Sequence, residues 1–162
     1  MANVISVDEL PILTRREVEA RILKPFLEEF EKELGEEKVK EIVVRIIEAD
    51  AKEHGATQAK LHGSNKLTDV PAIGGHHNEG GSLDLEVKWL AENKLLMKTL
   101  RCEYCEMYER IGMKKWGPYL SCGRDAAFFC GINSDFRFER TETLMEGGTC
   151  CDSVIIDTRG EK

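Results

Sequence analysis

The chain lacks the features that would place it in a membrane, on a secretory route or on a nucleic acid. None of its apolar runs approaches the roughly 18–20 residues that cross a bilayer, and its first twenty residues contain no basic stretch followed by an apolar one. Lysine and arginine number 23 against 30 aspartates and glutamates, so the net charge is −7 and no excess of cations exists to bind phosphates. We therefore expect a cytoplasmic protein with no membrane and no nucleic-acid partner.

Cysteine is absent from the first hundred residues, and all six lie between Cys102 and Cys151. In the cytosol thiols stay reduced, which favours catalytic, metal-binding or buried cysteines over disulfides. Histidine is absent after His77, so no Ser-His-Asp or Cys-His-Asp arrangement can be assigned from the sequence. We expect the chemistry to depend on thiols and carboxylates in the last third of the chain.

No internal repeat and no linker divides residues 1–162, which predicts a single domain. Thr14–Glu17 has the form of a helix capping box. Apolar residues then recur every three or four positions, which predicts an amphipathic helix ending at Gly35 and a second one ending near Gly55. The apolar residues of the first helix are Val18, Ile22, Leu23, Phe26, Leu27, Phe30 and Leu34. Residues 1–63 are thus expected to form an antiparallel helical scaffold.

Residues 64–82 break this periodicity with glycines and a proline, which predicts a flexible loop. His76 and His77 are its unusual content. The loop is either simply mobile or a flap that closes over a pocket.

Residues 83–157 are expected to form the site-bearing part, which mixes helices and strands. Its predicted elements are a helix from Ser82 to Glu92, a strand over 95–99, a helix over 101–112, a helix from Pro118 to Cys130, and a C-terminal hairpin whose strands, 136–145 and 150–157, join at Gly147-Gly148. The fold class predicted is α+β, with the N-terminal helical pair and further helices packed on a small antiparallel sheet.

The helix that begins near Pro118 carries the most informative residues. Helical spacing places Cys122, Asp125, Ala126, Phe129 and Cys130 on one side, which the apolar residues indicate is buried. A buried carboxylate needs a partner, and the predicted partner of Asp125 is Arg140. Two interpretations stay open: a structural ion pair, or the floor of a ligand pocket walled by the hairpin.

The cysteine spacing also allows a metal site. Cys102 and Cys105 form a C-x2-C pair that Cys150 and Cys151 could complete. Structural zinc sites use two such pairs, and adjacent cysteines are a poor second one. We therefore expect no metal and no other cofactor, with a zinc-stabilised module as an alternative.

The stretch from Arg101 to Asp152 resembles the L-2-amino-thiazoline-4-carboxylic acid hydrolase family. The resemblance rests on RCEYCEMY with Cys102, SCGRDAAF with Cys122 and Asp125, RTETLMEGG with Arg140, Thr143 and Glu146, and the pair Cys151-Asp152. A weaker likeness to 4-vinyl reductase-type small-molecule-binding domains agrees with the α+β fold. It also implies a homodimer.

The first resemblance implies hydrolytic opening of a cyclic isothiourea to an N-carbamoyl amino acid. Asp125 would hold the substrate's amidinium by paired hydrogen bonds, and Cys122 or Cys151 would attack its carbon. Cys122 is the first choice because it lies one turn from Asp125, although a nearby carboxylate raises a thiol's pKa. Glu146 would be the general base. The substrate-binding residues implied are Arg140, Arg124, Thr143, Cys102 and Asp152. A direct attack by water and a non-enzymatic small-molecule-binding domain remain alternatives.

Overall fold

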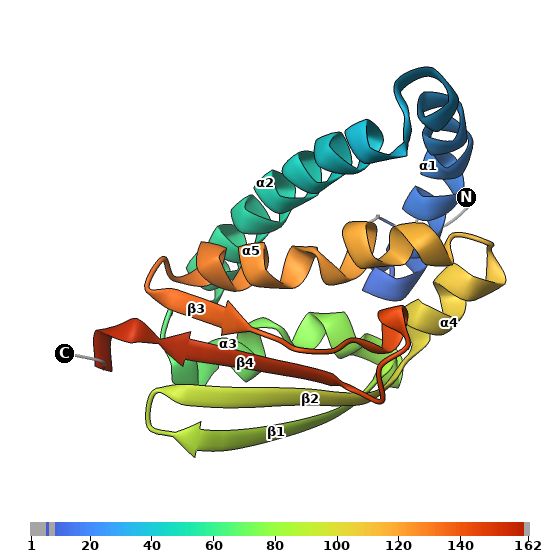
Figure 1. Cartoon of the computed structure of the whole chain (residues 1–162). Coiled ribbons are helices and arrows are strands. Elements are labelled where there is room, and N and C mark those ends of the chain that lie inside the picture. Colours follow the sequence, from blue (N-terminus) through green and yellow to red (C-terminus); the bar gives the residue numbers. More distant parts are fainter. Residues whose placement is uncertain (1–5, 7–8, 161–162) are drawn as a thin grey trace, which may run out of the picture.

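The structure is a computed structural model that describes residues 6 and 9–160 and combines helices with a four-stranded antiparallel sheet (Figure 1). Its strands are β1 (Leu83–Ala91), β2 (Lys94–Cys102), β3 (Phe136–Glu139) and β4 (Cys151–Asp157), arranged in the order β1-β2-β4-β3. In Figure 1 the long helices lie on one side of this sheet. The predicted α+β class is confirmed.

The two central strands supply both the core and the floor of the site. Leu95 of β2 pairs with Ile155 of β4, and both are 0% exposed. Side chains alternate between the faces of a strand, so Ser153 and Cys151 lie on the same face as Ile155. Thr99, the partner of Cys151, belongs to this face as well. Three small polar or thiol side chains therefore lie under the helices at one end of the sheet.

α1 (Ile12–Leu34) and α2 (Glu36–His62) form the predicted N-terminal pair, and Figure 1 shows them diverging from their junction at Gly35. The capping box predicted at Thr14–Glu17 is wrong, because α1 begins directly after Pro11, whose fixed φ suits a helix start. Among the described residues, no helix has both the length and the apolar character to cross a bilayer.

Only part of the predicted apolar stripe of α1 faces the core: Leu27 is buried and Leu23 packs against the core. Ile12, Ala20 and Leu27 are buried. Residues four apart advance by about 40° around a helix, so the predicted stripe winds away from the core. Its exposed members are Val18, Ile22, Phe26, Phe30 and Leu34.

Residues 64–82 are not a loop without regular structure, so that prediction is wrong. They form short helical segments: 3-10 turns at Leu67–Asp69 and Gly75–Gly81 around α3 (Val70–Ile73). Leu67, Val70 and Ile73 are buried and fix the segment to the core.

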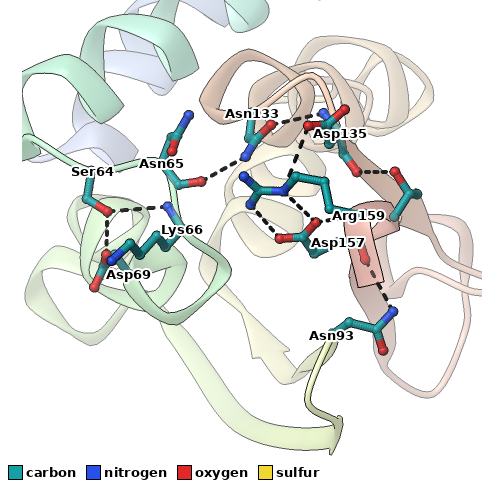
Figure 2. Close-up of polar contacts among 10 residues, drawn as sticks. Ser64, Asn65, Lys66, Asp69, Asn93, Asn133, Asp135, Asp157 and Arg159 are labelled. Carbon is teal, nitrogen blue, oxygen red and sulfur yellow. Dashed lines mark hydrogen bonds and ion pairs between the residues drawn. The ribbon is translucent and has the colours of Figure 1, made fainter. Parts of the chain in front are cut away.

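Polar contacts tie this segment to the C-terminal part of the chain (Figure 2). The Asn133 side chain donates a 3.0 Å hydrogen bond to the carbonyl of Asn65. Ser64 Oγ donates to Asp69 Oδ2 at 2.5 Å within the segment itself. The side chain of Asn93 donates to the Asp157 carbonyl at 3.2 Å, which joins the β1–β2 turn to the end of β4.

The helix predicted from Pro118 is interrupted. A π-helical turn, Pro118–Cys122, precedes α5 (Arg124–Ile132). Within α5 the side that faces the core carries Phe128, Phe129 and Ile132, which are buried, whereas Ala126 lies outside this side and is exposed. The predicted shared face is thus wrong for Ala126. The preceding helix, α4 (Glu103–Arg110), agrees with the prediction.

A helix prediction and the predicted hairpin turn are also wrong. Residues 83–91 form β1 and not a helix capped by Ser82, whose hydroxyl instead donates to the carbonyl of His77. β3 ends at Glu139, so residues 140–150 form a long connection and not a tight turn. Gly147, at φ +91°, closes a 3-10 turn (Leu144–Glu146) within that connection. The antiparallel pairing of β3 with β4 agrees with the predicted hairpin.

The core has two parts. One lies between the sheet, α2, α3 and α5 and includes Leu95, Phe128 and Ile155; the other lies under α1 and α4 and includes Leu27, Tyr108 and Trp116. The backbones of α2 and α5 touch in the first part, because a Cβ on Gly55 or on Gly131 would lie 2.1 Å from a backbone oxygen of the other helix. These contacts hold α5 against α2 and so fix the position of Asp125.

Candidate active site

Two adjoining pockets lie between the inner face of the sheet and the start of α5. We call the first, about 120 Å³, the thiol pocket, and the second, about 130 Å³, the aromatic pocket. Both are smaller than the roughly 300 Å³ of a pocket for a drug-sized ligand, so they suit a small molecule. The lining residues that they share are His77, Leu83, Thr99, Arg124, Asp125 and Ser153. The thiol pocket adds Arg16, Cys102, Cys122, Arg140 and Cys151.

Asp125 lies where the two pockets meet. Its Oδ2 accepts a 2.6 Å hydrogen bond from Arg140, which also donates to the carbonyl of Cys122 at 3.1 Å. The predicted Asp125–Arg140 pair is therefore present. The Asp125 side chain keeps 45% of its surface accessible, and that surface faces the pockets. Burial raises the pKa of Asp125, while the charge and the hydrogen bond of Arg140 act in the opposite direction.

Three of the six cysteines line the thiol pocket: Cys102, Cys122 and Cys151. Burial raises the pKa of the Cys102 thiol to about 11. It raises the pKa of Cys122 and Cys151 too, so all three are thiols near neutral pH. A thiolate would form here only with the help of a base.

The surroundings of Cys122 and Cys151 differ. Beyond burial, the negative charge of Asp125 raises the pKa of Cys122 further. The charge of Arg140 lowers the pKa of both thiols, but Cys151 Sγ also accepts a hydrogen bond from the backbone N–H of Leu144 at 3.4 Å, which opposes the effect of burial on its pKa. Cys151 is thus the better placed of the two to carry negative charge, which reverses the order expected from the sequence.

Asp152 points away from the pockets. Its oxygens accept hydrogen bonds from the backbone N–H groups of Thr141 and Glu142, both at 2.9 Å, and from the Thr141 hydroxyl at 2.5 Å. Against the desolvation of the carboxylate, these bonds lower the pKa of Asp152 to about 2. Asp152 therefore orders the segment that follows Arg140 and does not line the site.

Thr143 and Glu146 also lie outside both pockets. Thr143 is 3% exposed and caps the 3-10 turn: its Oγ1 accepts from the Glu146 N–H at 3.1 Å and donates to the Glu146 carboxylate at 2.7 Å. Glu146 itself is exposed. The structure does not bring these two predicted site residues to Asp125.

Two arginines besides Arg140 reach the pockets. Arg124, at the start of α5, lines both and is ion-paired with Asp50 of α2. Arg16, on the first turns of α1, lines the thiol pocket, pairs with Glu19 and has a side chain only 12% exposed. The sequence did not single out Arg16, because only the packing of α1 against the rest of the fold brings it here.

A histidine lies in the site, and it comes from the segment for which the sequence left a flap over the pocket as one alternative. His77 lines both pockets, and its ring packs edge-on against Phe128 and near His54, at centroid distances of 5.0 and 5.9 Å. The Tyr104 hydroxyl donates to the His77 carbonyl at 2.8 Å and fixes the backbone there. The side chain of His76 lies outside the described residues. His77 thus lines the pocket, as the flap interpretation expected, but the segment that carries it is an anchored helical turn.

The remaining cysteines have other environments. Cys105 donates weakly to the Leu144 carbonyl at 3.5 Å, and the buried Cys150 donates to Glu142 at 3.3 Å. Cys130 lines a wide, open groove between α2 and α5 whose other residues are largely charged. Within the described part of the chain, no group of three or more His, Cys, Asp or Glu residues is placed to hold a metal ion.

The fold and these pockets define an α+β protein with an acid, thiols, a histidine and cations around a site of small-molecule size. Comparison with protein families identifies the family to which the chain belongs. The model of the family described as L-2-amino-thiazoline-4-carboxylic acid hydrolase matches residues 15–154, and the chain belongs to this family of hydrolases. The match includes α1 and α2, where the sequence alone had shown no resemblance. A search of the curated proteins found no match.

Proposed function

We propose that the protein hydrolyses a cyclic isothiourea of the 2-amino-thiazoline-4-carboxylate type to an N-carbamoyl amino acid. The observation that supports this most is the meeting of Asp125, three thiols and two further cations, Arg16 and Arg124, around one small enclosed space. Such a substrate has an amidine at one end and a carboxylate at the other, so it matches the acid and the cations of the site.

Asp125 is the proposed partner of the amidinium. Arg140 occupies Oδ2, and no described residue donates a hydrogen bond to Oδ1. Asp125 lines both pockets, and a charge-assisted hydrogen bond from the amidinium to the free oxygen would orient the substrate's carbon. Arg140 fixes the carboxylate in this position, and the substrate carboxylate would bind Arg16 or Arg124.

Cys151 is the proposed nucleophile. Its sulfur attacks the carbon that bears two nitrogens, the ring C–S bond breaks, and the thiol proton ends on the departing ring sulfur. Water then attacks the same carbon, a C–O bond forms, and the bond to Cys151 breaks. Cys151 regains a proton from the water, and the second proton stays on the nitrogen of the carbamoyl product. No oxidant or reductant is needed.

Because the pocket thiols hold their protons near neutral pH, the mechanism needs a base. His77 is the proposed one, since it lines the same pocket as Cys151. Its Nδ1 lies 3.3 Å from the carbonyl oxygen of Gly74. A proton held there makes Nε2 the basic nitrogen, which would accept the thiol proton and pass it to the leaving sulfur.

The test is turnover of 2-amino-thiazoline-4-carboxylate by wild type and Asp125→Asn, followed through the thiol that ring opening releases. The variant keeps the shape of the side chain but loses its charge, and we expect kcat/KM to fall at least about a hundredfold. Asp84→Asn, the same change at an exposed position of β1, should be active. Full activity of Asp125→Asn would rule out the proposed role. Binding of the compound by wild type without any turnover would leave a binding domain instead.

A further inference from the structure

β1 is an edge strand with an unpaired side. It pairs with β2 along one side, and no described strand lies along the other (Figure 1). The strand is nine residues long, contains no proline, and every residue from Glu86 to Ala91 is exposed. Such an edge presents free N–H and C=O groups to any strand that can pair with it.

Apolar and charged side chains alternate along the middle of β1, and they point to opposite faces of the sheet. Leu85, Val87 and Trp89 lie on the face of the sheet that carries the core, opposite Thr99, Met97 and Leu95 of β2. Val87 and Trp89 nevertheless remain 45% and 44% exposed. The apolar layer of the sheet therefore continues to the edge without a cover.

The other face of β1 carries one acid and one base next to the middle of the strand, Glu86 and Lys88. Among the described residues, neither forms an ion pair. If a second copy pairs antiparallel about a two-fold axis, the axis must pass through a residue, because only residues of the same face lie opposite each other.

The charges then select one register. With the axis at Val87, Glu86 of each copy lies opposite Lys88 of the other, and Leu85 lies opposite Trp89. With the axis at Glu86 or at Lys88, two like charges face each other. Opposite charges across a strand pair stabilise it and like charges destabilise it, so the register at Val87 is favoured.

We propose that two copies of the chain associate through β1, antiparallel and with Val87 on the two-fold axis, so that one sheet runs through both. The pairing satisfies the free backbone groups of the edge and covers Val87 and Trp89. It does not depend on the hydrolase mechanism. The exposed stripe of α1 is the competing surface, but its residues wind around the helix and offer no comparable pairing of charges.

The experiment is a concentration series of molar-mass measurements on the full chain, by light scattering and sedimentation. Wild type should dimerise. Glu86→Lys and Lys88→Glu should each raise the dimer dissociation constant roughly tenfold or more, because two attractive pairs become repulsive. The double variant E86K/K88E restores opposite charges in the same register and should return the constant to near the wild-type value.

Three further variants make the test specific. Val87→Lys places two ammonium groups on the axis and should also prevent the dimer, while Leu61→Lys, at a 76% exposed position of α2, should not. A wild type that stays monomeric at all concentrations overturns the proposal. So does a dimer that Val87→Lys and both single charge reversals leave intact, particularly if F26E/F30E on α1 abolishes it. Circular dichroism of each variant confirms that the monomer is folded.

Discussion

At the scale of single residues, Cys151 and Cys122 share a pocket but have different neighbours. Arg140 favours charge on both thiols, but only Cys151 has the Leu144 N–H as a donor, whereas at Cys122 the charge of Asp125 is the main influence after burial and disfavours a thiolate. We therefore expect Cys151→Ser to lose at least about a hundredfold in kcat, and Cys122→Ser to lose less than tenfold. Steady-state kinetics of both variants would show this, with Cys105→Ser as a control outside the pocket.

Mass spectrometry of quenched wild-type reactions adds a direct test of the same step. A covalent adduct on the peptide that contains Cys151 agrees with the two-step mechanism. An adduct on Cys122, or full activity of Cys151→Ser, would contradict it. In the second case direct attack by water, with the thiols as pocket walls, would remain.

The residues of the site differ in how far the sequence could identify them. Asp125 and Arg140 could be paired in advance because each lies on an amphipathic element next to large apolar residues. Arg16 could not, and His77 was available only through the flap alternative, since their distance from Asp125 along the chain is bridged only by tertiary packing. Glu146 was assigned as a base from the family-like motif, yet its own hydrogen bond to Thr143 holds it in a local turn.

At the scale of elements, a prediction failed where neighbouring residues of the same segment indicated different kinds of secondary structure. Residues 83–91 alternate apolar and polar side chains with a period of two, which is typical of a strand, but the preceding Ser82 suggested a helix cap. The spacing of Ala126 and Phe129 suggested one face of α5, but the core lies on the side of Phe128, Phe129 and Ile132, and Ala126 falls outside it. The π turn before α5 leaves no mark in the sequence pattern. The existence of the long helices, where a period near 3.6 persists for several turns, was predicted well, although α2 continues past the predicted end at Gly55 to His62.

The connection between β3 and β4 depends on one carboxylate, Asp152. Replacing it with Asn removes the charge that two backbone N–H groups and the Thr141 hydroxyl stabilise, and should cost about 1–2 kcal/mol of unfolding free energy at pH 7. Because the pKa of Asp152 is lowered to about 2 on folding, its contribution is present above the unfolded value of about 4 and is lost as pH falls toward 2.

Urea unfolding of wild type and Asp152→Asn at several pH values measures this contribution. The difference in stability should be constant above about pH 5 and shrink between about pH 4 and 2. Carboxylates away from Asp152 titrate alike in both proteins and cancel in the comparison; Glu142, whose pKa the charge of Asp152 raises, is the exception. A difference that grows on acidification would contradict the assignment.

The contact between α2 and α5 depends on the absence of side chains at Gly55 and Gly131. A Cβ at either position would lie 2.1 Å from a backbone oxygen, which no rotamer change relieves. We expect Gly55→Ala and Gly131→Ala each to lower the unfolding free energy by about 3 kcal/mol or more. Gly75→Ala, which would meet no atom within 4 Å, should change it by less than about 0.5 kcal/mol. Thermal and urea unfolding would distinguish these outcomes.

At the scale of the whole molecule, the fold divides the six cysteines into two groups. Cys102, Cys122 and Cys151 come from β2, the π turn and β4 and meet in one enclosed pocket. Cys105, Cys130 and Cys150 lie elsewhere, and Cys130 borders an open groove. A ligand in the thiol pocket should therefore shield three thiols that are far apart in the sequence and leave the other three unchanged.

Iodoacetamide labelling, followed by peptide mass mapping, tests this division. Without ligand the pocket thiols should react slowly at pH 7, and the rate at Cys102 should rise about tenfold per pH unit toward its pKa of about 11. With saturating N-carbamoyl amino acid product, labelling of all three pocket cysteines should slow together while the rate at Cys130 stays the same. Protection of only one pocket cysteine, or equal protection of Cys130, would show that the three do not share a single ligand site, and the proposed arrangement of acid, base and nucleophile would fail with it.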